Sequence, residues 1–145
     1  MLLHLLLALS LAAAPTAAST DSARTTADGP LWTSVLAFDE LRVDADTAKV
    51  TGSGTFTVWL RWSFLDRASS PQAWDAGARG SFDLTEIDCA RSATRTFSSL
   101  AFRPDGSPVP TVSFEDATAD WRVTRAETVA GMLTAQLCGM ARAKR

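Results

Sequence analysis

The sequence predicts an α+β domain: a meandering antiparallel β-sheet with one C-terminal α-helix packed on one face, stapled by a disulfide. Three observations predict this class. Apolar and polar residues alternate in short segments from Leu31 onward, and the apolar period becomes helical only after Trp121. The chain also has two cysteines, Cys89 at the end of an alternating segment and Cys138 in the helical one. Strands followed by a single helix favour a sheet that buries one face under that helix.

Length and composition favour one folded domain. The chain has 145 residues, of which 46% are hydrophobic and 21% are charged, as is typical of a globular protein. The formal net charge is −2, so the chain lacks the overall basic field that nucleic-acid binding requires. We therefore expect no nucleic acid among its partners.

Residues 1–18 are predicted to be a secretory signal peptide. Residues 2–14 form an apolar run that is too short to span a bilayer, and small residues follow it up to Ala18. We expect cleavage near Ala18, export to the periplasm or the outer surface, and no stable membrane insertion afterwards. An uncleaved anchor would need a longer apolar run, and a lipid anchor would need a cysteine at the cleavage point, where there is none. Residues 19–30 are small and polar, which predicts a flexible lead-in.

Alternating segments and turn signals then follow in order. The expected strands span residues 31–38, 40–44, 47–51, 55–64, 81–89 and 95–102. Residues 66–80 contain Pro, Gly and Ser and show no period, which predicts a long loop. Residues 104–106 (PDG) predict a turn, and the two prolines of residues 108–114 favour an edge strand or a bulge.

Residues 55–64 form the strongest strand pattern and divide into two faces. The apolar face, expected to lie against the helix, consists of Phe56, Val58, Leu60, Trp62 and Phe64. The other face holds Trp59 and Arg61 among small polar residues. Three arrangements fit this second face. Arg61 stacks on the Trp59 indole beneath a loop formed by residues 66–80, or the two residues form a seam between two copies of the chain, or they bind a partner.

Residues 124–138 have the apolar spacing of a helix. The apolar positions include Val129, Met132, Leu133 and Leu137. Thr124 and Glu127 stand three apart, which predicts a capping box at the start of this helix. Gly131 should cost the helix up to about 1 kcal/mol. Gly139 is expected to end the helix.

In an exported protein, Cys89 and Cys138 are expected to form a disulfide. They are the only two cysteines, and in an oxidising compartment an even pair predicts a disulfide, whereas a cytosolic protein would keep two buried thiols. The bridge would close a loop of about 50 residues and contribute roughly 4 kcal/mol to stability in the chain-entropy model. It would hold the helix against the strand that ends at Cys89.

The mature chain has few residues suited to catalysis. The only histidine of the sequence, His4, is removed with the signal peptide, so a Ser-His-Asp site cannot form and zinc has no imidazole ligand. Asp44 and Asp46 match the Asp-x-Asp-x-Thr nucleophile motif of haloacid-dehalogenase-type phosphatases, but no α/β alternation accompanies them. The same segment does not match an EF-hand calcium loop, because Ala48 occupies a position where a calcium ligand is required. We expect a solvated turn here instead.

Asp83, Glu86 and Asp88 are candidates for the paired carboxylates of a glycosidase. Asp83 and Glu86 are an odd number of residues apart, so they face opposite ways on a strand. Glu86 and Asp88 share a face, which we expect to be the solvated side of that strand. We therefore expect no enzymatic activity, no cofactor and no metal.

The chain ends in a short basic cluster, residues 140–145, which includes Arg142, Lys144 and Arg145. We expect a frayed, solvated tail. A weak contact with a membrane surface or a polyanion is the alternative.

An ordered set of motifs resembles the bacterial surface-adhesin protein E family over about residues 31–139. The set is Trp32, "LRVD", "FTVWLRW", "EIDC", "PDG", Trp121 and a final helix ending in "QLC". The resemblance implies a six-stranded or similar antiparallel sheet, a C-terminal helix, the Cys89–Cys138 bridge and a dimer. The founding adhesin binds host extracellular-matrix and serum proteins and is anchored through a lipid, for which this chain has no cysteine at the cleavage point.

These observations predict an exported, non-enzymatic binding protein of the surface-adhesin type, with a host or envelope protein as its partner. A structural, envelope-associated protein without a host ligand is the alternative, and an exported hydrolase comes third. A homodimer is also expected from the resemblance.

Overall fold

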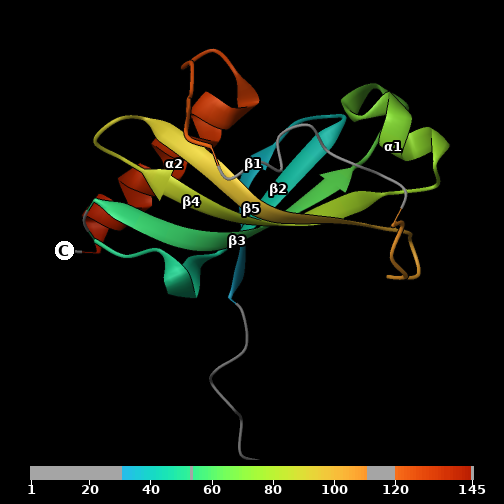
Figure 1. The fold of residues 1–145 in the computed structure, drawn as a ribbon, viewed down its shortest axis with the longest axis horizontal. Coiled ribbons are helices and arrows are strands. Elements are labelled where there is room, and N and C mark those ends of the chain that lie inside the picture. Colours follow the sequence, from blue (N-terminus) through green and yellow to red (C-terminus); the bar gives the residue numbers. More distant parts are fainter. Residues whose placement is uncertain (1–30, 53, 111–119, 145) are drawn as a thin grey trace, which may run out of the picture.

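The computed structural model describes residues 31–110 and 120–144, with the exception of residue 53. The signal peptide (1–18), the lead-in (19–30), residues 111–114 of the proline-containing segment and Arg145 lie outside the described residues. Six strands form one antiparallel sheet in the order β1-β2-β3-β4-β5-β6 (Figure 1). Their bounds are β1 Trp32–Ala37, β2 Leu41–Asp46, β3 Thr55–Phe64, β4 Gly80–Asp88, β5 Ala93–Phe102 and β6 Arg122–Val123. The predicted α+β class, a meander with one main C-terminal helix, is confirmed.

Two segments between strands differ from the prediction. Thr47–Lys49 forms a 3-10 helix, η1, instead of a strand, because the Asp46 carboxylate accepts from the Ala48 amide at 3.2 Å and turns the chain. Residues 66–80 hold a 3-10 helix, η2 (Arg67–Ser69), and a short helix, α1 (Pro71–Asp75), instead of an irregular loop. Proline at the first position of α1 suits a helix start, since its missing N–H would have had no partner there.

The C-terminal helix, α2, spans Val129–Ala143, and its start corrects the predicted capping box. Thr128 is the N-cap, and its hydroxyl accepts from the Gly131 amide at 3.1 Å. Thr124 is not available for capping, because its amide and its hydroxyl both donate to the Ser92 carbonyl oxygen, at 2.8 and 2.9 Å. This contact ties the segment before the helix to the end of the sheet.

The end of α2 also differs from the prediction, because Gly139 lies inside the helix and residues 140–143 continue it. Ala141 is buried and Met140 packs against the core, so burial offsets the helix-weakening effect of the glycine. The Lys144 ammonium donates to the carbonyl oxygens of Thr47 and Val50. Within the described residues, the basic end is therefore helical up to residue 143 and anchored through residue 144, and it is not the frayed tail that was predicted.

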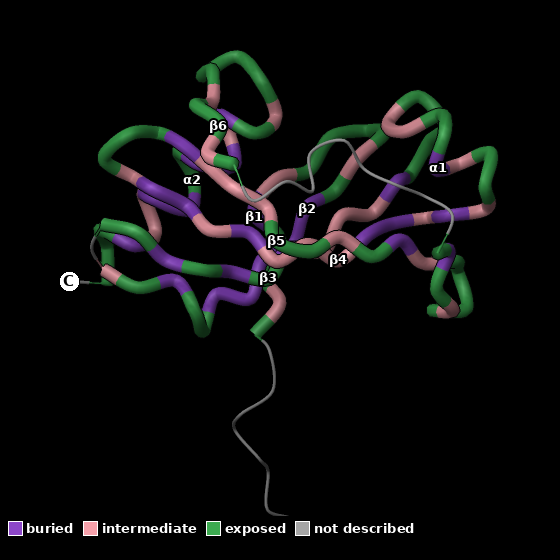
Figure 2. Tube along the Cα trace, in the orientation of Figure 1, coloured by how far each residue is buried: buried purple, intermediate pink, exposed green. Residues whose placement is uncertain are grey.

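The two faces of the sheet have different environments, which we call the helix face and the helix-free face. On the helix face, the side chains Phe56, Val58 and Leu60 of β3 are buried with Leu133 and Leu137 of α2. At the far end of the same face, Phe64 and Ala101 pack with Ala73 of α1. Figure 1 shows α2 toward one end of the sheet and α1 toward the other, and Figure 2 shows buried and exposed residues alternating along β3. The predicted core face of β3 is therefore confirmed.

None of the described helices is both long and apolar enough to cross a membrane.

Candidate functional site

The disulfide predicted from the two cysteines is present. Cys89, directly after β4, is bonded to Cys138 of α2, with a Cα–Cα distance of 5.6 Å. The bridge fixes α2 to the sheet at the end of β4. A disulfide is compatible with an exported protein.

The helix-free face displays aromatic and aliphatic side chains, whose positions follow from the strand register. Residues on this face include Trp32 of β1, Trp59 and Arg61 of β3, Phe82 of β4 and Leu100 of β5. Trp59 is 39% exposed and Leu100 is 48% exposed. The buried residues of α1 and α2 belong to the helix face, so within the described part of the chain no α-helix covers this surface.

An arginine held over an aromatic ring lies at the centre of this face. The guanidinium carbon of Arg61 lies 5.0 Å from the centre of the Trp32 ring. Asp44 accepts from Nε and Nη2 of the same Arg61 side chain at 3.0 and 2.7 Å, and Arg42 adds a third contact to this carboxylate at 3.2 Å. Phe82 continues the aromatic surface, with its ring centre 5.9 Å from that of Trp32. This network holds Arg61 in one orientation without covering it.

The predicted stack of Arg61 on Trp59 under a covering loop is wrong in both parts. Arg61 lies over Trp32, which β1 brings beside it across the sheet. Residues 66–80 pack on the opposite face, where Ala73 and Ala78 contact Phe64. Trp59 therefore stays exposed, and the two remaining arrangements, a seam between two copies or a partner-binding surface, both use this face.

Asp44 and Asp46 do not lie in a solvated turn as expected. Both are on β2 and buried, Asp44 with 3% exposure. Asp44 is the carboxylate beneath Arg61, and Asp46 accepts from the backbone amides of Leu31 and Ala48 at 3.0 and 3.2 Å. The pair positions its neighbours and has no geometry of a nucleophile with an acid–base partner.

A second arginine–aromatic cluster lies at the β5–β6 edge of the helix-free face. Arg91 and Arg95 lie over the Trp121 ring, at 4.6 and 4.7 Å from its centre. Arg95 pairs with Glu86 at 2.5 Å, and Arg91 pairs with Asp88 at 2.7 Å. The backbone amide and the guanidinium of Arg91 both donate to Asp88, and these bonds hold the pKa of its carboxyl below its ordinary value.

The acidic residues of β4 take the faces predicted from their spacing. Glu86 and Asp88 share the helix-free face, whereas Asp83 lies on the helix face, opposite Leu60. Asp88 differs from the expected solvated position, because it is buried beneath the Ala90 and Arg91 amides that it accepts from. Asp83 accepts from the Ser99 hydroxyl at 2.5 Å. Since the carboxylates are divided between two faces and committed to these partners, they do not flank a common substrate position.

Sequence reasoning missed Trp32, Phe82 and Trp121, which are half-buried members of the aromatic surface on this face. The register explains this, because Phe82 lies opposite Arg61 and Leu84 lies opposite Trp59, so these two apolar residues of β4 point away from the helix, unlike Ile87. An arginine and a tryptophan on the outer face of a strong strand were the available signal. Within the residues that the structure describes, no three His, Cys, Asp or Glu side chains gather in a way that could hold a metal ion.

No protein-family model, curated protein or solved structure matches this chain. The resemblance to the surface-adhesin protein E family therefore remains a prediction from the sequence.

Proposed function

We propose that this chain is an exported, non-enzymatic binding protein of the adhesin type, which docks a protein partner through the helix-free face of its sheet. The observation that carries the proposal is the exposure of Trp59 beside Arg61 on a face that no described α-helix covers. Tryptophan and arginine are the residues most enriched in binding hot spots, where they supply large contact areas and several hydrogen-bond donors. The disulfide supports the export step, and residues 1–18 supply the expected signal.

The charges of this face indicate the chemistry of the partner. The side chains of Arg61 and Arg95 are 31% and 32% exposed, whereas the carboxylates that pair with them, Asp44 and Glu86, are only 5% and 18% exposed. The face therefore presents guanidinium groups outward with carboxylates beneath them. A partner surface that combines acidic side chains with an apolar patch would complement this arrangement.

The test compares the wild-type mature chain with two variants that each truncate an exposed apolar side chain to alanine. Trp59→Ala removes the exposed ring of the helix-free face, and Leu65→Ala removes an exposed apolar side chain, 53% exposed, that follows the end of β3. Each protein is immobilised and exposed to purified extracellular-matrix proteins and to envelope extract, and retained proteins are quantified. We expect Trp59→Ala to weaken retention of the partner at least tenfold, as is typical of a hot-spot residue, and Leu65→Ala to leave it unchanged.

Three other outcomes would contradict the proposal or replace its partner. Equal retention by all three proteins would show that the helix-free face is not the docking surface. Retention of envelope components alone would favour a structural envelope role over an adhesin. A wild-type chain that sediments as a dimer, and a Trp59→Ala variant that sediments as a monomer, would assign the face to a second copy of the chain.

A further inference from the structure

A cavity of about 680 Å³ opens on the helix face, between the start of α2 and the η2–α1 segment. The two core clusters explain its position. One cluster buries Val58 and Ile87 under α2, and the other buries Phe64 and Ala101 against Ala73 of α1. Residues from both ends line the cavity, including Leu133 of α2 and Ser70 before α1. Its size lies within the range of about 300–1,000 Å³ that is usual for small-molecule sites.

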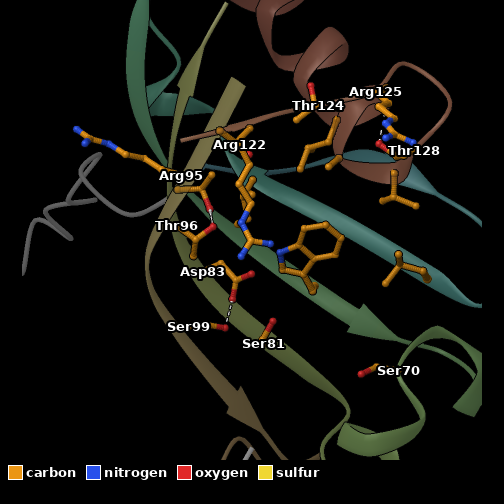
Figure 3. Close-up of a pocket in the computed structure, with 18 of the residues that line it drawn as sticks. Ser70, Ser81, Asp83, Arg95, Thr96, Ser99, Arg122, Thr124, Arg125 and Thr128 are labelled. Atoms are coloured by element: carbon orange, nitrogen blue, oxygen red, sulfur yellow. Dashed lines mark hydrogen bonds between the residues drawn. The ribbon is translucent and has the colours of Figure 1, made fainter. Parts of the chain in front are cut away.

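The cavity has an apolar side and a polar side. The apolar side is formed by Leu41, Leu60, Trp62, Phe64 and Leu133. The polar side comes from three neighbouring strands, which contribute Asp83, Ser99 and Arg122. Figure 3 shows the side chains of Asp83 and Arg122 extending toward each other, and the Ser99 hydroxyl donating to Asp83. The hydroxyls of Thr85 and Thr96 are hydrogen-bonded to each other at 3.2 Å. A few convergent polar groups on a mainly apolar wall are typical of a ligand site.

The side chain of Trp62 carries a buried hydrogen-bond donor at the cavity. It packs against both core clusters and lines the space between them. Among the described residues, its indole Nε1 is a buried donor with no hydrogen-bond partner. Buried donors in folded proteins are nearly always paired, because leaving one unpaired costs about 1–3 kcal/mol. Because this donor has less than 1 Å² of accessible surface, an acceptor on a molecule bound in the cavity pairs with it only when the side chains that cover it move on binding.

The charged residues around the cavity balance one another. Asp83 and Asp120 carry negative charge, and Arg122 and Arg125 carry positive charge. A fifth charged residue, Arg95, is engaged with Glu86. The wall therefore has no excess of either sign that would favour an anion or a cation.

We propose that this cavity binds a small uncharged molecule with an apolar body and a hydrogen-bond acceptor, such as a carbonyl oxygen, that accepts from Trp62 Nε1. The site lies on the face opposite the proposed protein-docking surface, so it is an additional function and does not depend on that surface. The apolar side of the cavity holds the body of the ligand, and the indole N–H fixes its orientation.

The test uses Nile red, an uncharged dye with a fused aromatic body and a carbonyl oxygen, and the full mature chain. Dye fluorescence should rise and saturate at one dye per chain. Trp62→Phe keeps an aromatic ring but removes the N–H, so we expect dye affinity to fall about tenfold. Trp59→Phe makes the same chemical change on the opposite face and should leave the affinity unchanged. Thr96→Phe fills the cavity and should abolish binding.

A second measurement reports directly on the proposed hydrogen bond. In the ¹H–¹⁵N spectrum, the indole signal that disappears in Trp62→Phe should move downfield when the dye binds to the wild-type chain. The signal that disappears in Trp59→Phe should not move. Thermal melting of each variant shows that it is folded. 8-Anilinonaphthalene-1-sulfonate, an anionic dye of similar size, should displace Nile red from the site at least tenfold more weakly than non-fluorescent, uncharged analogues of Nile red do.

Four results would overturn the proposal. They are no saturable binding of Nile red, binding that Trp62→Phe and Thr96→Phe leave unchanged, an equal loss of affinity in Trp59→Phe, or equal competition by the anionic dye. Loss of partner retention in Trp59→Ala with intact dye binding would leave this proposal standing, so the two functional proposals can fail separately.

Discussion

Alanine at the two glycines of α2 should change the stability of the protein in opposite directions. Both Gly131 and Gly139 lie inside the helix, where propensity alone favours alanine by about 1 kcal/mol. A Cβ at position 131 would lie 1.8 Å from the Arg125 carbonyl oxygen and 3.0 Å from the Ala126 Cα. A Cβ at position 139 would meet no atom within 4 Å apart from its chain neighbours and the backbone of its own helix. We therefore expect Gly131→Ala to destabilise the fold and Gly139→Ala to stabilise it.

The magnitude at position 131 follows from the contacts of the Arg125 carbonyl. This oxygen accepts from the amide and the hydroxyl of Thr128, at 3.0 and 2.7 Å. The Thr128 hydroxyl in turn caps the helix through the Gly131 amide. A shift that makes room for a methyl group disrupts this cap, at a cost of about 1–2 kcal/mol, and adds the overpacking cost of about 1–3 kcal/mol. After the gain in helix propensity, the net loss should be about 2 kcal/mol.

The assay is urea unfolding of the purified mature chain, followed by far-ultraviolet circular dichroism. Gly131→Ala should lower the free energy of unfolding by about 2 kcal/mol and the melting temperature by about 8 °C, whereas Gly139→Ala should raise the free energy by about 0.5–1 kcal/mol. Gly139→Ala also serves as the control, because it makes the same change in the same helix. If Gly131→Ala were neutral or stabilising, the backbone of residues 125–126 would not approach the helix as described.

Two further predictions concern the disulfide and the response to acid. Loss of the Cys89–Cys138 bridge, which spans 49 residues, should lower the free energy of unfolding by about 4 kcal/mol in the chain-entropy model. Cys89→Ser and reduced wild type should therefore melt together, and equal melting of wild type with and without dithiothreitol would contradict this. Because Arg91 holds the pKa of Asp88 below its ordinary value, ionised Asp88 stabilises the fold above about pH 4, and this stability is lost as the pH falls through the folded pKa. Asp88→Asn should flatten the decline in melting temperature between pH 7 and pH 3, and parallel curves would count against it.

The features that the sequence predicted correctly depend on local repetition. The alternation of residues 55–64 predicted the buried positions Phe56, Val58 and Leu60, because a strand places every second side chain on one face. The helical spacing of Leu133 and Leu137 predicted the buried side of α2 in the same way. The cysteine pair could be predicted because the chain has no third cysteine to compete for a bond.

The features that the sequence did not predict depend on residues distant in the chain. Thr124 has the spacing of a capping residue, but it donates to Ser92, which lies 32 positions earlier. Arg61 has Trp59 two positions away on its own strand, but its guanidinium lies over Trp32 because the antiparallel register brings β1 close. Gly131 was expected only to weaken the helix, since no local pattern shows that the backbone of Arg125 passes against it.

The position of the cavity follows from a mismatch in length between the sheet and its main helix. Fifteen residues of α2 span about 22 Å, whereas ten residues of β3 span about 33 Å, so α2 cannot cover the whole helix face even if it were aligned with the strand. A fold under selection for stability alone would fill the uncovered part with apolar side chains.

Three successive positions of β4 on that face are polar instead. Ser81, Asp83 and Thr85 lie opposite Trp62, Leu60 and Val58 of β3 in the register of the sheet. In a solid core, each polar group would have to be desolvated beside an apolar neighbour, and each would have to find a protein partner. Hydrogen bonds to Thr96 and Ser99 reduce this conflict for Thr85 and Asp83, and the cavity beside them leaves space that a ligand can enter. The polar side of β4 and the unpaired indole donor of Trp62 both fit the proposed binding site, although Asp83 and Thr85 also have protein partners in Ser99 and Thr96.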